Sequence, residues 1–222
     1  SLPMLSSVMK SEAPGLYEVE SNNGQTIYTT EDGQYLLTGD LLKITDTGIA
    51  NVSEQARARQ RKAALEAYGS DGLIRFPAKE EKAVINVFTD IDCPYCRKLH
   101  DEVPQLNRYG ITVNYYAFPR SGPDTPSFRK YESVWCADNP QAAMTAAKSG
   151  QPVESAQGDN PVLEQYELGG RIGVTGTPAS RISFLAASLR PIASMLDGFG
   201  PTQMRPASMT ACAKPAFSDR NP

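Results

Sequence analysis

Two cysteines separated by two residues, in the run Cys93-Pro94-Tyr95-Cys96, are the residues best suited to carry out chemistry. At the start of a helix, unpaired backbone N–H groups and the helix dipole would favour an anion at the first sulfur. A thiolate attacks disulfides, and a second thiol one turn inward displaces the mixed disulfide that results. The spacing therefore predicts thiol–disulfide exchange, with Cys93 as the attacking thiolate and Cys96 as the resolving thiol.

A metal or haem site is the main alternative use of such a pair. The other candidate zinc ligands are Cys136, Cys212 and His100, and none of them forms a second closely spaced pair of ligands. Haem attachment needs a histidine directly after the second cysteine, where this chain has Arg97. We therefore expect no metal and no cofactor, and a purely structural cysteine pair remains a further alternative.

The residues around the pair predict a β-α-β unit. Residues 83–88 form a nearly continuous apolar run of strand length, which suits a strand buried on both faces of a sheet. After Cys96 the apolar residues recur at helical spacing, Gly110 suits the end of that helix, and residues 111–118 form a second apolar run. The pair is thus expected where a buried strand passes into a helix.

Further helices precede a loop that ends in proline. The helical stretches that we expect are 126–137, 140–148 and 161–171. The loop, Gly-Val-Thr-Gly-Thr-Pro, spans residues 173–178, and residues 179–185 could form a strand. After that strand, residues 186–222 contain five prolines and no alternating apolar pattern, so we expect no further hairpin there.

The first 70 residues differ in character from the rest. Residues 16–44 alternate short β-type runs with Asn-Gly and Asp-Gly turns, which predicts a small meander. The meander is either an extension packed on the main domain or a dimerisation module that pairs edge strands with a second copy. Residues 52–68, preceded by Asn51 with Glu54 three positions later, predict a capped linker helix with a solvated arginine face.

The composition excludes several classes of protein. A chain of 222 residues forms one large domain or two small ones. Its 22 basic and 25 acidic residues leave a net charge of −3, so we expect no nucleic-acid partner. No apolar run approaches the roughly 18 residues that a membrane span needs, and residues 1–15 lack the pattern of a signal peptide. We therefore expect a soluble chain.

Taken together, these features resemble the bacterial periplasmic disulfide isomerases of the DsbC/DsbG family over about residues 15–179. The residues that carry the resemblance surround the cysteine pair, the following strand, a later Trp-Cys pair and the proline loop. They are residues 88–100, 110–113, 117–120, 135–136 and 173–179.

The resemblance implies an α+β fold with a thioredoxin-like catalytic domain. A small β-rich dimerisation domain would span residues 1–52 and a linker helix residues 53–70. The thioredoxin-like domain, with a helical insertion, would span residues 71–185, and an atypical tail residues 186–222.

The resemblance also implies a role for each site residue. Cys93 would attack substrate disulfides, and Cys96 would resolve the product. Pro178 would be a cis proline that exposes the Thr177 backbone for strand-like pairing with a peptide. The implied substrate-binding residues are Pro94, Tyr95, Thr177 and Pro178.

The implied activity is that of a protein disulfide isomerase or reductase in the periplasm. It would act as a homodimer on misfolded disulfide-containing proteins, with a membrane thiol reductase as electron donor. Two alternatives remain: a non-catalytic dimeric chaperone that binds unfolded chains, and a DsbG-like or glutaredoxin-like thiol reductase.

One position near the pair departs from what such proteins carry. Many thioredoxin-fold redox proteins have a buried carboxylate six residues before the first cysteine, and here that position is Val87. Asp90 and Asp92 follow the strand, and we expect them to cap the helix N-terminus.

Cys136 matches a cysteine that forms a second disulfide in the family, but the partner position is Gly158 in this chain. Cys136 is then either a buried free thiol or is paired with Cys212.

Overall fold

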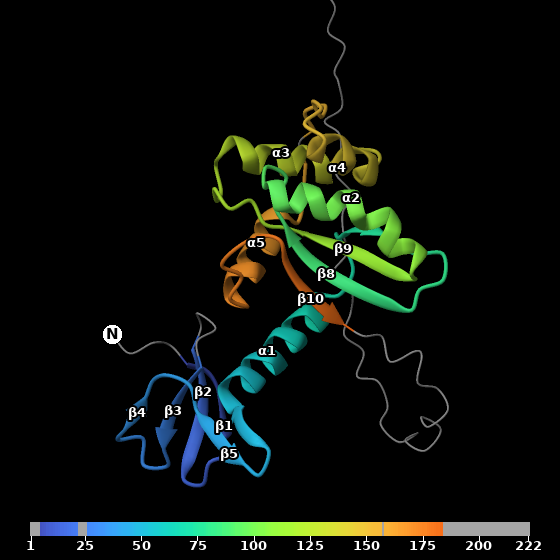
Figure 1. Cartoon of the computed structure of the whole chain (residues 1–222). Coiled ribbons are helices and arrows are strands. Elements are labelled where there is room, and N and C mark those ends of the chain that lie inside the picture. The colour runs from blue at the N-terminus through green and yellow to red at the C-terminus, as the bar shows by residue number, and fades with distance from the viewer. Residues whose placement is uncertain (1–4, 22–25, 157, 184–222) are drawn as a thin grey trace, which may run out of the picture. The chain divides into compact units, whose positions relative to one another are not determined.

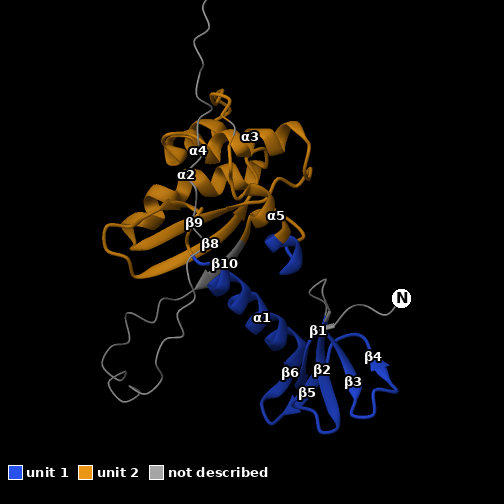
Figure 2. Ribbon diagram, turned by 180° about the vertical axis from the view of Figure 1, so that it is seen from behind, with its two compact units in different colours: residues 1–69, 168–174 blue, residues 70–167, 175–222 orange. Residues whose placement is uncertain are grey.

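The computed structural model describes residues 5–21, 26–156 and 158–183 (Figure 1). The chain divides into two compact units, coloured separately in Figure 2: Ser1–Gly69 with Leu168–Val174, and Ser70–Glu167 with the residues from Thr175 onward. The expectations for the tail, residues 186–222, lie outside the described residues. Within the described ranges, no helix is long and apolar enough to cross a membrane.

The first unit is an antiparallel meander followed by a helix, as the sequence predicts. One sheet joins its strands in the order β1-β2-β3-β4, and β5 pairs with β6 in a separate hairpin. The elements are β1 (Leu5–Lys10), β2 (Leu16–Ser21), β3 (Thr26–Thr30), β4 (Leu36–Leu37), β5 (Leu42–Thr45), β6 (Gly48–Asn51) and α1 (Val52–Tyr68). The Asn51 side chain caps α1, because it accepts a 2.8 Å hydrogen bond from the Glu54 backbone N–H.

The second unit is built on a mixed sheet with the strand order β10-β8-β9-β7. Strands β8 and β9 run parallel and are joined by α2, which is the predicted β-α-β unit, while β7 and β10 pair antiparallel with them. The elements after residue 70 are β7 (Ile74–Phe76), β8 (Ala83–Thr89), α2 (Pro94–Arg108), β9 (Ile111–Ala117), α3 (Pro126–Trp135), α4 (Pro140–Lys148), α5 (Val162–Arg171) and β10 (Ala179–Ser183).

The core of the second unit lies between the sheet and the helices α2, α3 and α4, which gather on one side of the sheet (Figure 1). Val87 and Val113 from the central strands meet Tyr131 and Met144 from the helices, and all four side chains are fully buried. Burial of such side chains stabilises the fold by about 25 cal/mol per Å² of apolar surface. The core therefore holds the end of β8 and the start of α2 in a defined position.

Candidate active site

The cysteine pair lies where β8 passes into α2. Strand β8 ends at Thr89, residues 90–92 form a short turn, and Cys93 is the N-cap of α2 with Pro94 in the first turn. Proline is tolerated there because the N–H that it lacks would have no partner within the helix. The Cys93 N–H donates to the Asp90 carbonyl oxygen at 3.3 Å and closes the turn. Both cysteines of the pair are free thiols.

The sulfur of Cys93 faces the proline loop, and its Sγ lies 3.4 Å from the Thr177 carbonyl oxygen. Burial raises the pKa of Cys93, but the backbone N–H groups of Cys96 and Tyr95 and the neighbouring Thr177 side chain lower it. The pKa of Cys93 therefore lies below its ordinary value. This direction favours Cys93 as the attacking thiolate.

The sulfur of Cys96 lies one turn further into the molecule, and the residue is fully buried. Burial raises the pKa of Cys96 above its ordinary value, although the backbone of Asp90, the side chains of Thr177 and Thr89 and the charge of Lys148 oppose the rise. The Asp90 N–H donates to Cys96 Sγ at 3.3 Å. The inner sulfur is therefore the protonated thiol of the pair, which suits a resolving role.

The proline loop reaches the cysteines through the sheet. The Thr177–Pro178 peptide is cis, and β10 begins at the next residue, Ala179, which pairs with Phe88 of β8. Because Phe88 lies near the end of β8, this pairing sets the Thr177 carbonyl beside Cys93.

Pro94 and Tyr95 are exposed at the start of α2, and the Tyr95 side chain shows 74% of its surface to solvent. Pro178 is half-buried. The structure thus gathers the predicted site residues Cys93, Pro94, Tyr95, Cys96, Thr177 and Pro178 around one thiol.

The expectation that Asp90 and Asp92 cap α2 is wrong, because no side chain among the described residues caps this helix. The Asp90 carboxylate accepts from the Asp92 N–H at 2.8 Å and from Arg120 Nε at 2.9 Å. The Asp92 carboxylate binds Lys130 Nζ at 2.6 Å. The Asp92 carboxylate also lies 3.5 Å from Arg97 of α2 itself, so the two carboxylates bind cations rather than the helix N–H groups, and they hold the turn instead.

Sequence reasoning missed Tyr131, which ties α3 to this turn. Its hydroxyl accepts from the Ile91 N–H at 2.8 Å and donates to the Thr89 carbonyl oxygen. Burial keeps the pKa of Tyr131 well above its ordinary value, so the phenol stays protonated and able to donate. A tyrosine at helical spacing indicates only a residue that packs in the core, so the sequence does not predict that the Tyr131 hydroxyl binds the turn before Cys93.

Sequence reasoning also missed Lys148, which is buried with 3% of its surface exposed. Its Nζ donates to the Thr89 hydroxyl at 2.8 Å and to the Asp90 carbonyl oxygen at 3.5 Å. A lysine in the last turn of a helix usually interacts with the helix dipole in solvent, so its burial beside the cysteines could not be expected.

His100 is a core residue whose two ring nitrogens are both engaged. Nε2 lies 3.0 Å from the Thr145 hydroxyl, and Nδ1 lies 3.1 Å from the Tyr115 hydroxyl. Because the Thr145 hydroxyl donates to the Gln141 carbonyl oxygen, Nε2 carries the proton and Nδ1 accepts. Burial lowers the pKa of His100 to about 4, so the ring is neutral near pH 7.

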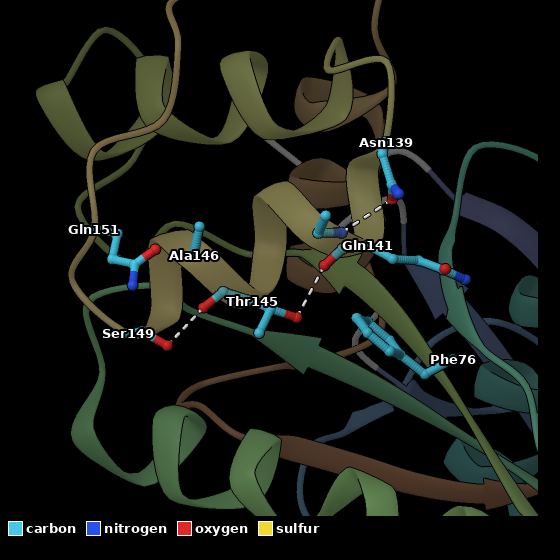
Figure 3. Close-up of a pocket in the computed structure, with 8 residues that line it drawn as sticks. Phe76, Asn139, Gln141, Thr145, Ala146, Ser149 and Gln151 are labelled. Carbon is cyan, nitrogen blue, oxygen red and sulfur yellow. Dashed lines mark hydrogen bonds between the residues drawn. The ribbon is translucent and has the colours of Figure 1, made fainter.

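An open depression of about 470 Å³ runs along α4 (Figure 3). Hydrogen bonds between neighbouring residues already engage several of its polar groups, including the Ser149 hydroxyl, which donates to Thr145. The lining residues are Phe76, Asn139, Gln141, Ala142, Thr145, Ala146, Ser149 and Gln151. Since this lining contains neither cysteine of the pair nor Thr177, the depression is separate from the candidate active site.

Cys136, at the end of α3, is disulfide-bonded, so the expectation of a free thiol is excluded. The other expectation, pairing with Cys212, concerns a residue outside the described ranges. Gly158 lies in a bend before α5.

Two family models match the chain. The model of a thioredoxin-like domain matches residues 70–198, and the model of the disulfide bond isomerase protein N-terminal domain matches residues 4–54.

Known proteins are similar over most of the chain. This chain is 38% identical over 177 residues to the thiol:disulfide interchange protein DsbC of Pasteurella multocida. The aligned region covers 79% of this chain and 75% of that protein. The chain is 35% identical over 178 residues to DsbC of Escherichia coli, covering 80% and 73%. A solved structure of a disulfide interchange protein from Neisseria gonorrhoeae matches with a TM-score of 0.46 and 30% identity, over 52% of this chain and 86% of that chain.

Proposed function

We propose, because the chain belongs to the DsbC family of thiol:disulfide interchange proteins, that Cys93 and Cys96 rearrange the disulfides of misfolded proteins in the periplasm. The chain is a thiol:disulfide oxidoreductase with the function of a protein disulfide isomerase. The contrast between the two sulfurs carries the assignment of roles: the pKa of Cys93 is lowered at a helix N-terminus, and the pKa of Cys96 is raised by full burial.

The first step is attack by the Cys93 thiolate on a wrong disulfide of the substrate. A bond forms between Cys93 Sγ and one substrate sulfur, the substrate disulfide breaks, and the other substrate sulfur leaves as a thiolate that takes up a proton. The backbone N–H groups at the start of α2 stabilise the attacking anion and, in the reverse direction, Cys93 as leaving group.

The mixed disulfide then has two fates. A different thiolate of the substrate attacks the substrate sulfur of the mixed disulfide, which forms a new substrate disulfide, breaks the bond to Cys93 and releases Cys93 as a thiolate, completing an isomerisation. Alternatively, Cys96 attacks Cys93 Sγ, which releases a reduced substrate and leaves the pair oxidised. The second route needs an electron donor to restore the thiols, and we assign this role to a membrane thiol reductase.

The substrate lies, in this proposal, as an extended strand along Thr177 and Pro178. The pairing of β10 with β8 begins at Ala179, so the Thr177 backbone just before the cis peptide lies outside this ladder, where an extended peptide can pair with it. The exposed Tyr95 and Pro94 offer apolar contact beside the reacting sulfur without specifying a sequence.

Family membership supports disulfide-containing substrates and a homodimer. In the first unit, Ile44 and Ile49 pair across β5 and β6 and expose 88% and 71% of their surfaces. Exposed apolar side chains of this kind mark surfaces that meet another chain. The match of residues 4–54 to the isomerase N-terminal domain also weighs against a monomeric glutaredoxin-like reductase.

Reactivation of a scrambled-disulfide protein tests the proposal. We expect Cys93→Ser to abolish reactivation, and Cys96→Ser to accumulate a covalent complex with the substrate on non-reducing gels. Lys98→Met, at an exposed position of α2, is the matched control and keeps wild-type activity. Equal reactivation by Cys93→Ser and wild type refutes the catalytic role and leaves the non-catalytic chaperone.

A further inference from the structure

Lys148 is a buried cation next to the cysteine pair. None of the proposed steps of thiol–disulfide exchange assigns it a role. Among the ion pairs of the described residues none includes it, and the carboxylate of the neighbouring Asp90 binds Arg120 instead. Its Nζ lies 5.3 Å from the centre of the Tyr115 ring and donates to two oxygens, those of the Thr89 hydroxyl and the Asp90 carbonyl. Lysine is rarely buried to this extent, because removing its charge from water is unfavourable.

Both residues that accept from Lys148 also contact Cys96. The Asp90 N–H donates to Cys96 Sγ at 3.3 Å, and the neighbouring Thr89 side chain lowers the pKa of Cys96. The Thr89 hydroxyl accepts from the ammonium at 2.8 Å, so its proton is left to donate to a sulfur that ionises beside it. Thr89 and Asp90 thus lie between Lys148 of α4 and Cys96 of α2.

The inner thiol must lose a proton before it can attack, because the thiolate is the nucleophile. Val87 is fully buried and offers no group that could take this proton. An amine in contact with the bridging hydroxyl can take it, and the ammonium that forms is then a counter-ion for the thiolate.

We propose that Lys148 is the positioning residue of the resolving step, taking the Cys96 proton through the Thr89 hydroxyl and then stabilising the Cys96 thiolate. This inference rests on the proposed function. The Cys96 S–H bond breaks and an N–H bond forms on Lys148. The thiolate attacks Cys93 Sγ, the Cys93–Cys96 bond forms, and the bond to the substrate sulfur breaks. The substrate leaves as a thiolate that takes up a proton, so it gains the two electrons that the cysteine pair loses.

The charge state of Lys148 suits this exchange. Burial lowers its pKa to about 8, although Cys96, Asp90 and Cys93 oppose the shift. Near neutral pH both the amine and the ammonium are therefore populated. Arg97 on α2 also lowers the pKa of Lys148.

The other titratable groups that surround Lys148 do not compete for the proton. His100 on α2 is neutral, because burial lowers its pKa to about 4. Tyr115 on β9 remains a neutral phenol, because burial raises its pKa. Near neutral pH, Lys148 is thus the group that can exchange charge with Cys96.

Rapid-quench analysis of the reduced full chain mixed with oxidised glutathione separates the two steps. Acid trapping and mass spectrometry follow formation of the mixed disulfide on Cys93 and then its conversion to the Cys93–Cys96 disulfide, over a range of pH. The variants are Lys148→Met, which keeps an unbranched side chain one atom shorter and removes the charge, and Lys98→Met, which removes an exposed lysine from α2.

We expect Lys148→Met to slow the conversion about tenfold at pH 7 and to raise the pH midpoint of that step by about one unit, as loss of a neighbouring opposite charge does. Lys98→Met should match wild type in both. Conversion in Lys148→Met at the rate and midpoint of Lys98→Met overturns the inference.

A second variant keeps the test valid if Lys148→Met does not fold. Thr89→Val removes the bridging hydroxyl and retains the lysine, and it should also slow conversion and raise its pH midpoint. Unchanged conversion in Thr89→Val overturns the relay. Failure of wild type to form the mixed disulfide on Cys93 refutes the proposed function itself, whereas unchanged conversion after normal formation refutes only the role of Lys148.

Discussion

Tyr131→Phe removes one oxygen atom from the core of the second unit and tests how the turn before Cys93 is held. The hydroxyl of Tyr131 is the hydrogen-bond partner of the Ile91 N–H and of the Thr89 carbonyl oxygen. Ile91, Thr89 and Tyr131 are all fully buried, so water cannot replace the lost oxygen without opening the core.

The expected loss of stability follows from these two groups. A buried polar group left without a partner costs about 1–3 kcal/mol, and the variant leaves the Ile91 N–H and one acceptor site on Thr89 unmatched. Phenylalanine keeps the ring, so no large cavity forms and the apolar contribution is unchanged. We therefore expect the free energy of unfolding to fall by about 3 kcal/mol.

Urea unfolding followed by tryptophan fluorescence measures this loss, because Trp135, the single tryptophan of the chain, lies in α3 of the same unit. Tyr109→Phe is the matched control, since Tyr109 exposes 63% of its surface and should lose almost nothing. A Tyr131→Phe variant as stable as Tyr109→Phe, within about 0.5 kcal/mol, would refute the argument that this hydroxyl holds the turn.

Three further predictions concern the thiol, the assembly and a glycine. Iodoacetamide should alkylate Cys93 before Cys96. Because the pKa of Cys93 is lowered, alkylation of Cys93 should also remain fast at a lower pH than alkylation of an ordinary thiol. Peptide mapping that finds Cys96 modified first would contradict the assignment of Cys93 as attacking thiolate and Cys96 as resolving thiol. A chain truncated to begin at residue 70 should sediment as a monomer, and a persisting dimer would place the interface outside the N-terminal unit. Gly110→Ala should lower the urea midpoint more than Gly150→Ala: both have positive φ, but only at Gly110 would the added Cβ lie 2.6 Å from a backbone oxygen. If the two variants lowered the urea midpoint equally, the clash between the added Cβ at Gly110 and the backbone oxygen would have no effect on stability, which would contradict the prediction.

Local patterns predicted the elements that carry the cysteines. The apolar run of β8, the helical spacing after Cys96 and Gly110 at the helix end each depend on residues near one another in the sequence. The same holds for Asn51, whose cap on α1 reaches only three residues ahead. The proline loop was placed by its resemblance to a family motif, and its pairing with β8 agrees with that placement.

Contacts between distant segments could not be predicted in this way. Asp90 and Asp92 carry the right residue type for a helix cap, yet the Asp90 carboxylate binds Arg120, and the Asp92 carboxylate binds Lys130 and Arg97. Sequence alone does not show which cation will lie beside which carboxylate, because that choice depends on how loops and helices pack.

By itself, the sequence determined the chemistry and its main participants, because Cys93 and Cys96 are set by a four-residue motif and by the helix that must begin there. Only the tertiary structure decided the surroundings of the inner thiol. Lys148 follows Cys96 by 52 residues and comes to lie beside Thr89 and Asp90, next to this thiol, only because α4 packs against α2 and the end of β8. A buried charge acquires its role from the groups that exclude water around it, and packing alone brings those groups together.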